Sequence, residues 1–205
     1  MLTAFTAGLL LITISELGDK TFFIAAIMAL RHPRRLVFIA VVAALAAMTL
    51  LSVLLGQAAS FLPKVYLKNL EIGLFLIFGV KLLIEAWRMS PKINCSALNE
   101  AEEAIEQSAK NSNRNKTNWA IILETFLLTF VAEWGDRTQF ATITLAASNN
   151  AVGVTLGAIS GHTICAAIAI IGSKMLAGRI SEKMVSALGG SLFLVFAVVA
   201  IWEKS

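Results

Sequence analysis

The chain has 205 residues, of which 58% are hydrophobic and 15% charged, with a mean hydropathy of +0.79. Soluble domains average about 45–50% apolar and about 25% charged residues, so a single water-soluble core and a disordered chain are both excluded. Two cysteines are too few for a disulfide scaffold. The excess of 17 Lys and Arg over 13 Asp and Glu is, in so apolar a chain, typical of cytoplasmic membrane loops rather than of nucleic-acid binding.

Six apolar stretches are long enough to cross a hydrocarbon core, which takes about 20 helical residues. They are Leu2–Leu30, Leu36–Leu62, Leu67–Trp87, Asn118–Ala147, Val152–Leu176 and Val185–Trp202. No basic residue precedes Lys20, so we expect the N-terminus to stay as the first span rather than to be a cleaved signal. The polar segment Arg88–Thr117 is expected to be a loop. Asn99 and Glu102 predict a short surface helix over Glu100–Lys110, with a solvated linker as the alternative.

Basic residues in the loops predict the orientation, because cytoplasmic loops are enriched in Lys and Arg. With residue 1 outside, the cytoplasmic side holds eleven of them: Arg31, Arg34, Arg35, Arg88, Lys92, Lys110, Arg114, Lys116, Lys174, Arg179 and Lys183. The other side holds three: Lys64, Lys68 and Lys204. Both termini are therefore expected to be extracytoplasmic and the central loop cytoplasmic. Cys95 then lies in a reducing compartment and Cys165 in a span, so no disulfide is expected.

An internal repeat divides the chain. Glu16-Leu17-Gly18-Asp19-Lys20-Thr21-Phe22-Phe23 matches Glu133-Trp134-Gly135-Asp136-Arg137-Thr138-Gln139-Phe140, and Phe75-Leu76-Ile77-Phe78 matches Phe193-Leu194-Val195-Phe196. Three spans per copy is an odd number, so the second copy enters the membrane from the opposite side, as in many secondary transporters. The predicted fold is an all-α integral membrane protein of six transmembrane helices in two inverted three-helix repeats. Residues 1–88 form the first repeat, 89–117 the cytoplasmic loop and 118–205 the second repeat.

The repeated motif places carboxylates in the middle of long apolar stretches, where a charge costs at least about 2.5–3.5 kcal/mol and usually faces a cavity or a partner. Glu16 and Asp19 are three residues apart, as are Glu133 and Asp136, so each pair would share one helical face. Four carboxylates form an all-oxygen shell that suits hard divalent cations. We expect these four acids to bind the metal, with no resident cofactor. Buried structural ion pairs are the alternative.

Several neighbours are expected to support this site. Lys20 and Arg137 lie four residues after a glutamate, where they would pair with it, orient the acids or occupy the site when the metal leaves. Thr21 and Thr138 can add hydroxyl oxygens. Gly18 and Gly135 permit close packing or local unwinding, which would release carbonyl ligands.

Other polar residues within the spans are more ambiguous. Glu124 either lines an access path or reaches the interface, and His162 is a proton relay, a metal ligand or a packed core residue. Gly153, Gly157 and Gly161 recur every four residues, which predicts close helix packing against the motif helices. Glu71 and Glu85 lie toward the ends of the third span, or one turn from a lysine, and are interpreted as mostly structural.

The two motifs resemble the double E-x-G-D-[KR]-[TS] signature of the transmembrane protein 165 family, and the resemblance covers essentially the whole chain. It implies exchange of Mn²⁺ or Ca²⁺ for protons, with the motif acids as the site. The compact chain resembles bacterial, particularly cyanobacterial, members linked to manganese export, which implies a plasma or thylakoid membrane. The resemblance to the second-repeat helix also adds weight to His162.

Alternating access would let the four acids take a cation from the cytoplasm, release it outside and return protonated. Two other functions compete with this one. An intramembrane aspartyl protease would use Asp19 and Asp136, but Glu16 and Glu133 stand where that motif needs a glycine, and the neighbouring cations oppose a shared-proton dyad. A passive channel would conduct without proton counterflow. The sequence leaves open the choice between Mn²⁺ and Ca²⁺, the stoichiometry and whether the chain forms a homo-oligomer.

Overall fold

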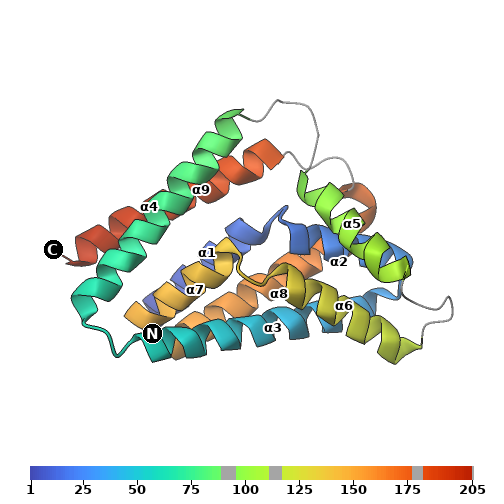
Figure 1. The fold of residues 1–205 in the computed structure, drawn as a ribbon, viewed down its shortest axis with the longest axis horizontal. Coiled ribbons are helices and arrows are strands. Elements are labelled where there is room, and N and C mark those ends of the chain that lie inside the picture. The colour runs from blue at the N-terminus through green and yellow to red at the C-terminus, as the bar shows by residue number, and fades with distance from the viewer. Residues whose placement is uncertain (89–95, 111–116, 177–181, 205) are drawn as a thin grey trace.

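The computed structural model describes residues 1–88, 96–110, 117–176 and 182–204, and this part of the chain is helical with no strand (Figure 1). The helices are α1 (Leu2–Glu16), α2 (Lys20–Arg31), α3 (Arg34–Ala59), α4 (Lys64–Arg88), α5 (Ser96–Lys110), α6 (Asn118–Ala132), α7 (Arg137–Ser148), α8 (Ala151–Leu176) and α9 (Glu182–Lys204). Several residues assigned to loops from the sequence lie outside the described part: Lys92, Cys95, Arg114, Lys116 and Arg179.

Three of the described helices are long and apolar enough to cross a membrane: Arg34–Ala59, Ala151–Ser173 and Lys183–Trp202. The expected span Leu2–Leu30 is divided into α1 and α2, and Asn118–Ala147 is divided into α6 and α7. Each division falls at a copy of the repeated motif. The apolar helices α1 and α6 that precede these breaks are too short to cross a membrane alone.

The two halves of the chain repeat the same series of helices. A 15-residue helix, a 12-residue helix and a 26-residue helix follow one another as α1, α2 and α3, and again as α6, α7 and α8. A further long helix ends each series, α4 in the first half and α9 in the second. The internal sequence repeat therefore has a matching repeat in the order and length of the helices.

Packing between the halves is crosswise, and Figure 1 shows α4 lying along α9. The long helix of each half packs on the broken helix pair of the other, α8 on α1 and α2, and α3 on α6 and α7. Gly153, Gly157 and Gly161 form the surface of α8 that faces α1, where added side chains would meet the α1 backbone at Met1, Phe5 and Leu9. The predicted packing of these glycines against a motif helix is confirmed.

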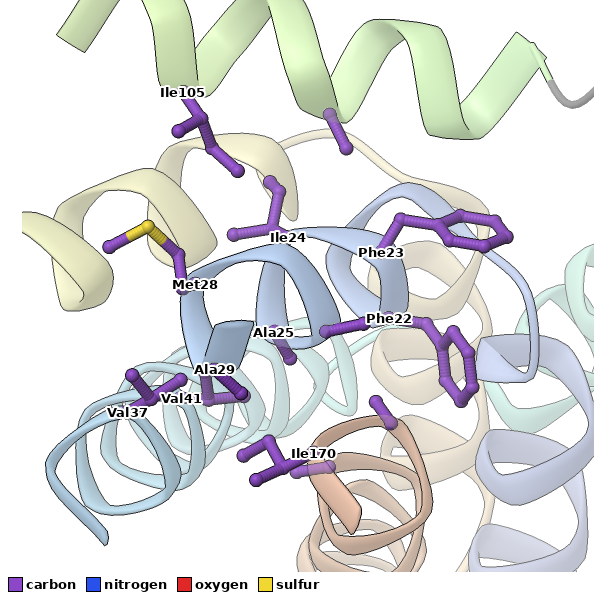
Figure 2. Packing of buried hydrophobic residues seen from close by; sticks show 14 of the residues in the cluster. Phe22, Phe23, Ile24, Ala25, Met28, Ala29, Val37, Val41, Ile105 and Ile170 are labelled. Carbon is purple, nitrogen blue, oxygen red and sulfur yellow. The ribbon is translucent and has the colours of Figure 1, made fainter. Parts of the chain in front are cut away.

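Helix α2 is enclosed on three sides (Figure 2). Ile24 and Met28 of α2 lie toward Ile105 of α5, while its opposite side meets Val41 of α3 and Ile170 of α8. The predicted surface helix is thus present, and it begins at Ser96, four residues earlier than expected. Because Ile105 and its neighbours are buried, α5 is a packed cover over α2 rather than a solvated linker.

Enlarging Gly157 should separate α1 from α8. We expect Gly157→Leu to destabilise the protein by about 1–3 kcal/mol, the usual cost of overpacking, and to lower the melting temperature in detergent by about 2–4 °C per kcal/mol. Gly73→Leu is the matched control, because nothing lies within 4 Å of an added side-chain carbon at Gly73. Equal melting temperatures for the two variants would contradict the packing described here.

Candidate cation-binding site

Both copies of the motif form a break between two helices. Gly18 and Gly135 have φ values of +75° and +81°, a left-handed conformation that only glycine adopts without strain. In each copy the aspartate N–H donates to the glutamate carbonyl oxygen at 3.2 Å, Asp19 to Glu16 and Asp136 to Glu133. Of the two roles that the sequence leaves open for these glycines, close packing and local unwinding, the structure shows the unwinding. The expectation that each acid pair shares one helical face is wrong, because the glutamate stands at the end of one helix and the aspartate precedes the next.

Each motif glutamate is held by the threonine five residues later. The Thr21 hydroxyl donates to Glu16 Oε2 at 2.8 Å, and the Thr138 hydroxyl donates to Glu133 Oε1 at 2.5 Å. Both glutamates are 2% exposed, and within the described part of the chain their second oxygens, Glu16 Oε1 and Glu133 Oε2, have no hydrogen-bond partner. A buried carboxylate oxygen without a partner is costly, so each is a ready acceptor for a cation or a proton.

The acids of the two halves meet at the breaks. One carboxylate oxygen from each of Glu16, Asp19 and Asp136 lies within 4.8 Å of the others. Glu133 is not in this group, but the Thr138 hydroxyl that donates to Glu133 also lies 3.4 Å from Asp136 Oδ2. The structure therefore brings together acids that are more than a hundred residues apart in sequence.

The two basic residues of the motifs behave differently. Arg137 Nη2 lies 3.4 Å from Asp19 Oδ1 in the other half, and Arg137 Nε lies 3.7 Å from Asp136 Oδ1. Lys20 Nζ instead lies 3.6 Å from Glu100 of α5. The expected pairing of each basic residue with the glutamate four residues earlier is wrong, because the helix break between them changes the direction of the chain.

Gln139 is part of the site and was missed by sequence reasoning. Its side-chain oxygen accepts the Gly135 N–H at 2.7 Å, which ties the second break to the first turn of α7. Its amide nitrogen lies 3.1 Å from the Met48 sulfur of α3. The available signal was the difference between the motif copies, since Phe22 stands at this place in the first.

Two supporting candidates are outside the group of acids that lie close together. Glu124 accepts a hydrogen bond from the Ser108 hydroxyl at 2.8 Å, so it joins α6 to α5. His162 is buried in α8, and its Nδ1 has no hydrogen-bond partner within the described residues. Neither residue belongs to the lining of the cavity that reaches the motifs.

That cavity, here called the motif cavity, has a volume of about 190 Å³. Its lining includes Asp19, Arg137, Glu85 of α4, Glu100 of α5 and Phe193 of α9. Asp19 is the acid of the cluster that borders the cavity, while Glu16 lies deeper in the protein. A cation entering here would meet Asp19 first.

The site therefore offers carboxylate and hydroxyl oxygens between apolar helices. Such donors suit hard divalent cations, whereas Zn²⁺ and Cu²⁺ favour imidazole and thiolate. Broken apolar helices that present polar groups at their ends are the arrangement by which secondary transporters hold ions. The fold and the site together define a helical membrane transporter of cations.

Comparison with known families agrees with this class. The family model of the divalent cation/proton antiporter GDT1 matches residues 4–90 and 121–205, which include both motifs. The chain belongs to the GDT1 family. It is therefore a membrane transporter that exchanges divalent cations for protons, and not an enzyme. Neither the protease nor the passive channel receives support from this membership.

Similar proteins come from cyanobacteria and plants. The chain is 61% identical over 204 residues to GDT1-like protein sll0615 of Synechocystis, covering 100% of this chain and 99% of the relative. It is 43% identical over 201 residues to GDT1-like protein 3 of Oryza sativa (95% and 72% of the two chains). It is 39% identical over 215 residues to the chloroplastic PAM71-homolog protein of Arabidopsis thaliana (98% and 59%). No solved structure matches the chain.

Substitution of Gly135 tests the backbone of the second break. Nothing lies within 4 Å of an added side-chain carbon, so the cost of Gly135→Ala comes from the positive φ alone. We expect it to destabilise the protein by about 1–2 kcal/mol. Gly135→Asn should cost less, because asparagine tolerates this conformation. Thermal unfolding in detergent measures both, and a more stable Gly135→Ala would contradict the strain argument.

Proposed function

We propose that the protein exports Mn²⁺, Ca²⁺ or both from the cytoplasm in exchange for protons, and that Glu16, Asp19, Glu133 and Asp136 bind the cation. The observation that carries this proposal is the meeting of two helix breaks, where two buried glutamates each keep one oxygen that has no hydrogen-bond partner among the residues that the structure describes. The divalent ion is the cargo and H⁺ the counter-ion. Thr21 and Thr138 orient the glutamates, and Gly18 and Gly135 shape the breaks.

The proposed architecture has six membrane crossings in two inverted repeats, with α1 plus α2 and α6 plus α7 as broken spans. Residues 1–88 and 118–205 are the repeats, and 89–117 the loop between them. Both termini are extracytoplasmic and α5 is cytoplasmic. In support, the helix series occurs twice in the chain, and each copy pairs with the other crosswise. The cyanobacterial relative favours a bacterial plasma or thylakoid membrane.

In the proposed exchange, Arg137 balances part of the negative charge of the acid cluster. Its guanidinium lies between Asp19 and Asp136, where it partly neutralises the cluster when no metal is bound. A divalent cation would take over this role and release Arg137. Protons bound to the carboxylates would also neutralise the cluster, so the metal and protons compete for one set of carboxylates. A single site that opens alternately to the two sides of the membrane can then perform the exchange.

Removing one acid tests the site. We expect Glu16→Gln and Asp136→Asn each to slow proton-driven Mn²⁺ uptake into inside-out vesicles about tenfold or more, since a hydrogen bond or ligand contact to a charged group contributes about 1.5–3 kcal/mol. Glu103→Gln is the control, because Glu103 is an exposed acid on α5. Unchanged uptake in both site variants, with normal expression, would overturn the assignment.

The cargo is tested with purified protein in liposomes. A pH-sensitive dye inside the vesicles should report proton release when Mn²⁺ or Ca²⁺ is supplied, and Mg²⁺ should act more weakly because it gives up its water shell reluctantly. Metal entry without proton movement would contradict exchange. A response to Mg²⁺ alone would contradict the proposed cargo.

A further inference from the structure

A second cavity lies between the same helices as the motif cavity. This cavity, here called the Glu71 cavity, has a volume of about 240 Å³. Both cavities are bordered by α1, α4, α7 and α9. The motif cavity is bordered by the end of α1 and by α5, whereas the Glu71 cavity is bordered by Thr3 and Thr6 at the start of α1 and by Ala200 near the end of α9. Figure 1 shows both termini at the end of the molecule away from α5.

Phenylalanines separate the two cavities. Phe193 lines the motif cavity and Phe75 lines the Glu71 cavity, and their ring centroids are 5.9 Å apart. Phe78 and Phe196 extend the contact, at 5.8 Å from Phe193 and 6.0 Å from Phe75 respectively. Phe75 and Phe193 are at most 1% exposed. The four rings thus close the space between α4 and α9 with apolar surface, which a hydrated ion does not enter.

The linings that α4 and α9 give the two cavities correspond through the internal repeat. Phe75 matches Phe193 in sequence, and the same offset of 118 residues relates Leu82 to Ala200. Phe193 and Leu82 line the motif cavity, whereas Phe75 and Ala200 line the Glu71 cavity. The basic residues of the motifs do not follow this exchange, because Lys20 and Arg137 both line the motif cavity. Under an inverted repeat, the correspondence between α4 and α9 supports placing the two cavities at the two ends of one path.

The Glu71 cavity has an acid of its own. Glu71 is 2% exposed and lies one helical turn before Phe75. Among the described residues that line this cavity, it is the one with a charged side chain. Lys68 Nζ lies 3.2 Å from Glu71 Oε2. Gly189 is the residue equivalent to Glu71 in the second repeat. It lines the motif cavity, where the motifs already supply acids.

We propose that the Glu71 cavity is the extracytoplasmic vestibule of the transport path, that Glu71 is the acid that receives the cation and returns protons there, and that Phe75 and Phe193 form the barrier between the two vestibules. This inference rests on the proposed exchange function. It revises the sequence-based interpretation of Glu71 as structural. A buried carboxylate on the far side of an apolar barrier gives a partly dehydrated cation a place to stop before it reaches water.

Thiol labelling tests the vestibules without relying on transport. In a Cys95→Ser background, in which Cys165 is buried, Thr6→Cys should react with a membrane-impermeant thiosulfonate from the extracytoplasmic side. Ser186→Cys, in the motif cavity, should react from the cytoplasmic side. Labelling of both from one side, or labelling of Thr6→Cys only by a lipid-soluble reagent, would overturn the proposal.

The barrier is tested by proton-independent flux of Mn²⁺ in liposomes at equal pH. The Phe75→Ala/Phe193→Ala double variant should raise this leak by about two orders of magnitude, the factor set by the cost of a charge in the bilayer core. Phe126→Ala is the matched control, since Phe126 stacks on Phe130 in α6 and lines neither cavity. A leak no larger than that of the control would overturn the barrier.

Glu71 is tested against its possible structural role. Glu71→Gln should slow proton-driven Mn²⁺ exchange about tenfold or more, Glu71→Asp should retain most of it, and Glu71→Gln/Lys68→Met should stay slow. If Glu71 only balances Lys68, the double variant removes both charges and exchange recovers, which would overturn the proposal. Exchange by the unmodified protein is the reference: its absence rejects the proposed function, whereas active exchange with an unaffected Glu71→Gln rejects this inference alone.

Discussion

The fold depends on one constraint: carboxylates that are expensive to bury are held between apolar helices. Glu16 and Glu133 are almost completely buried, and each accepts a hydrogen bond from the threonine five residues later. In a continuous helix at these positions, the backbone carbonyl oxygens would accept hydrogen bonds within the helix. The acids would then have few polar groups beside them. Both helices instead break at a glycine, and the two breaks bring Glu16, Asp19 and Asp136 together.

The remaining helices hold these breaks in place. A break between two short helices has little stability by itself, so each is supported by a long unbroken helix from the other half of the chain, α8 behind α1 and α2, and α3 behind α6 and α7. Glycines on α8 allow the backbones of α8 and α1 to approach closely. This crosswise support makes the site depend on both halves, and neither half contains a complete acid cluster.

The structure is not symmetric at the site, although the motifs are nearly identical. Arg137 reaches across to Asp19, while Lys20 turns toward Glu100 on α5. Gln139 ties the second break to α3 through Met48, and the first motif has Phe22 at that position. An exchanger that alternates between two open states must be asymmetric in each of them. Here the asymmetry consists of equivalent residues, such as Lys20 and Arg137, that contact different partners.

Much of this could be predicted from the sequence, because hydrophobicity and repetition are local properties. The apolar stretches, the short helix before the second half, the glycine packing stripe and the repeat of the acidic motif all follow from spacing. The partners of the charged groups do not. Lys20 and Arg137 have equivalent places in the motifs and follow equivalent turns at Gly18 and Gly135. Even so, Lys20 pairs with Glu100 of α5, whereas Arg137 pairs with Asp19 of the other motif.

Composition and repetition thus establish a helical membrane protein with two copies of an acidic motif. The folded protein adds that the motifs are helix breaks, that Asp136 joins Glu16 and Asp19, and that Phe75 and Phe193 stand between two cavities. The physical reason is that these contacts join residues far apart in the chain, and their geometry is set by how α4, α8 and α9 pack rather than by any local pattern.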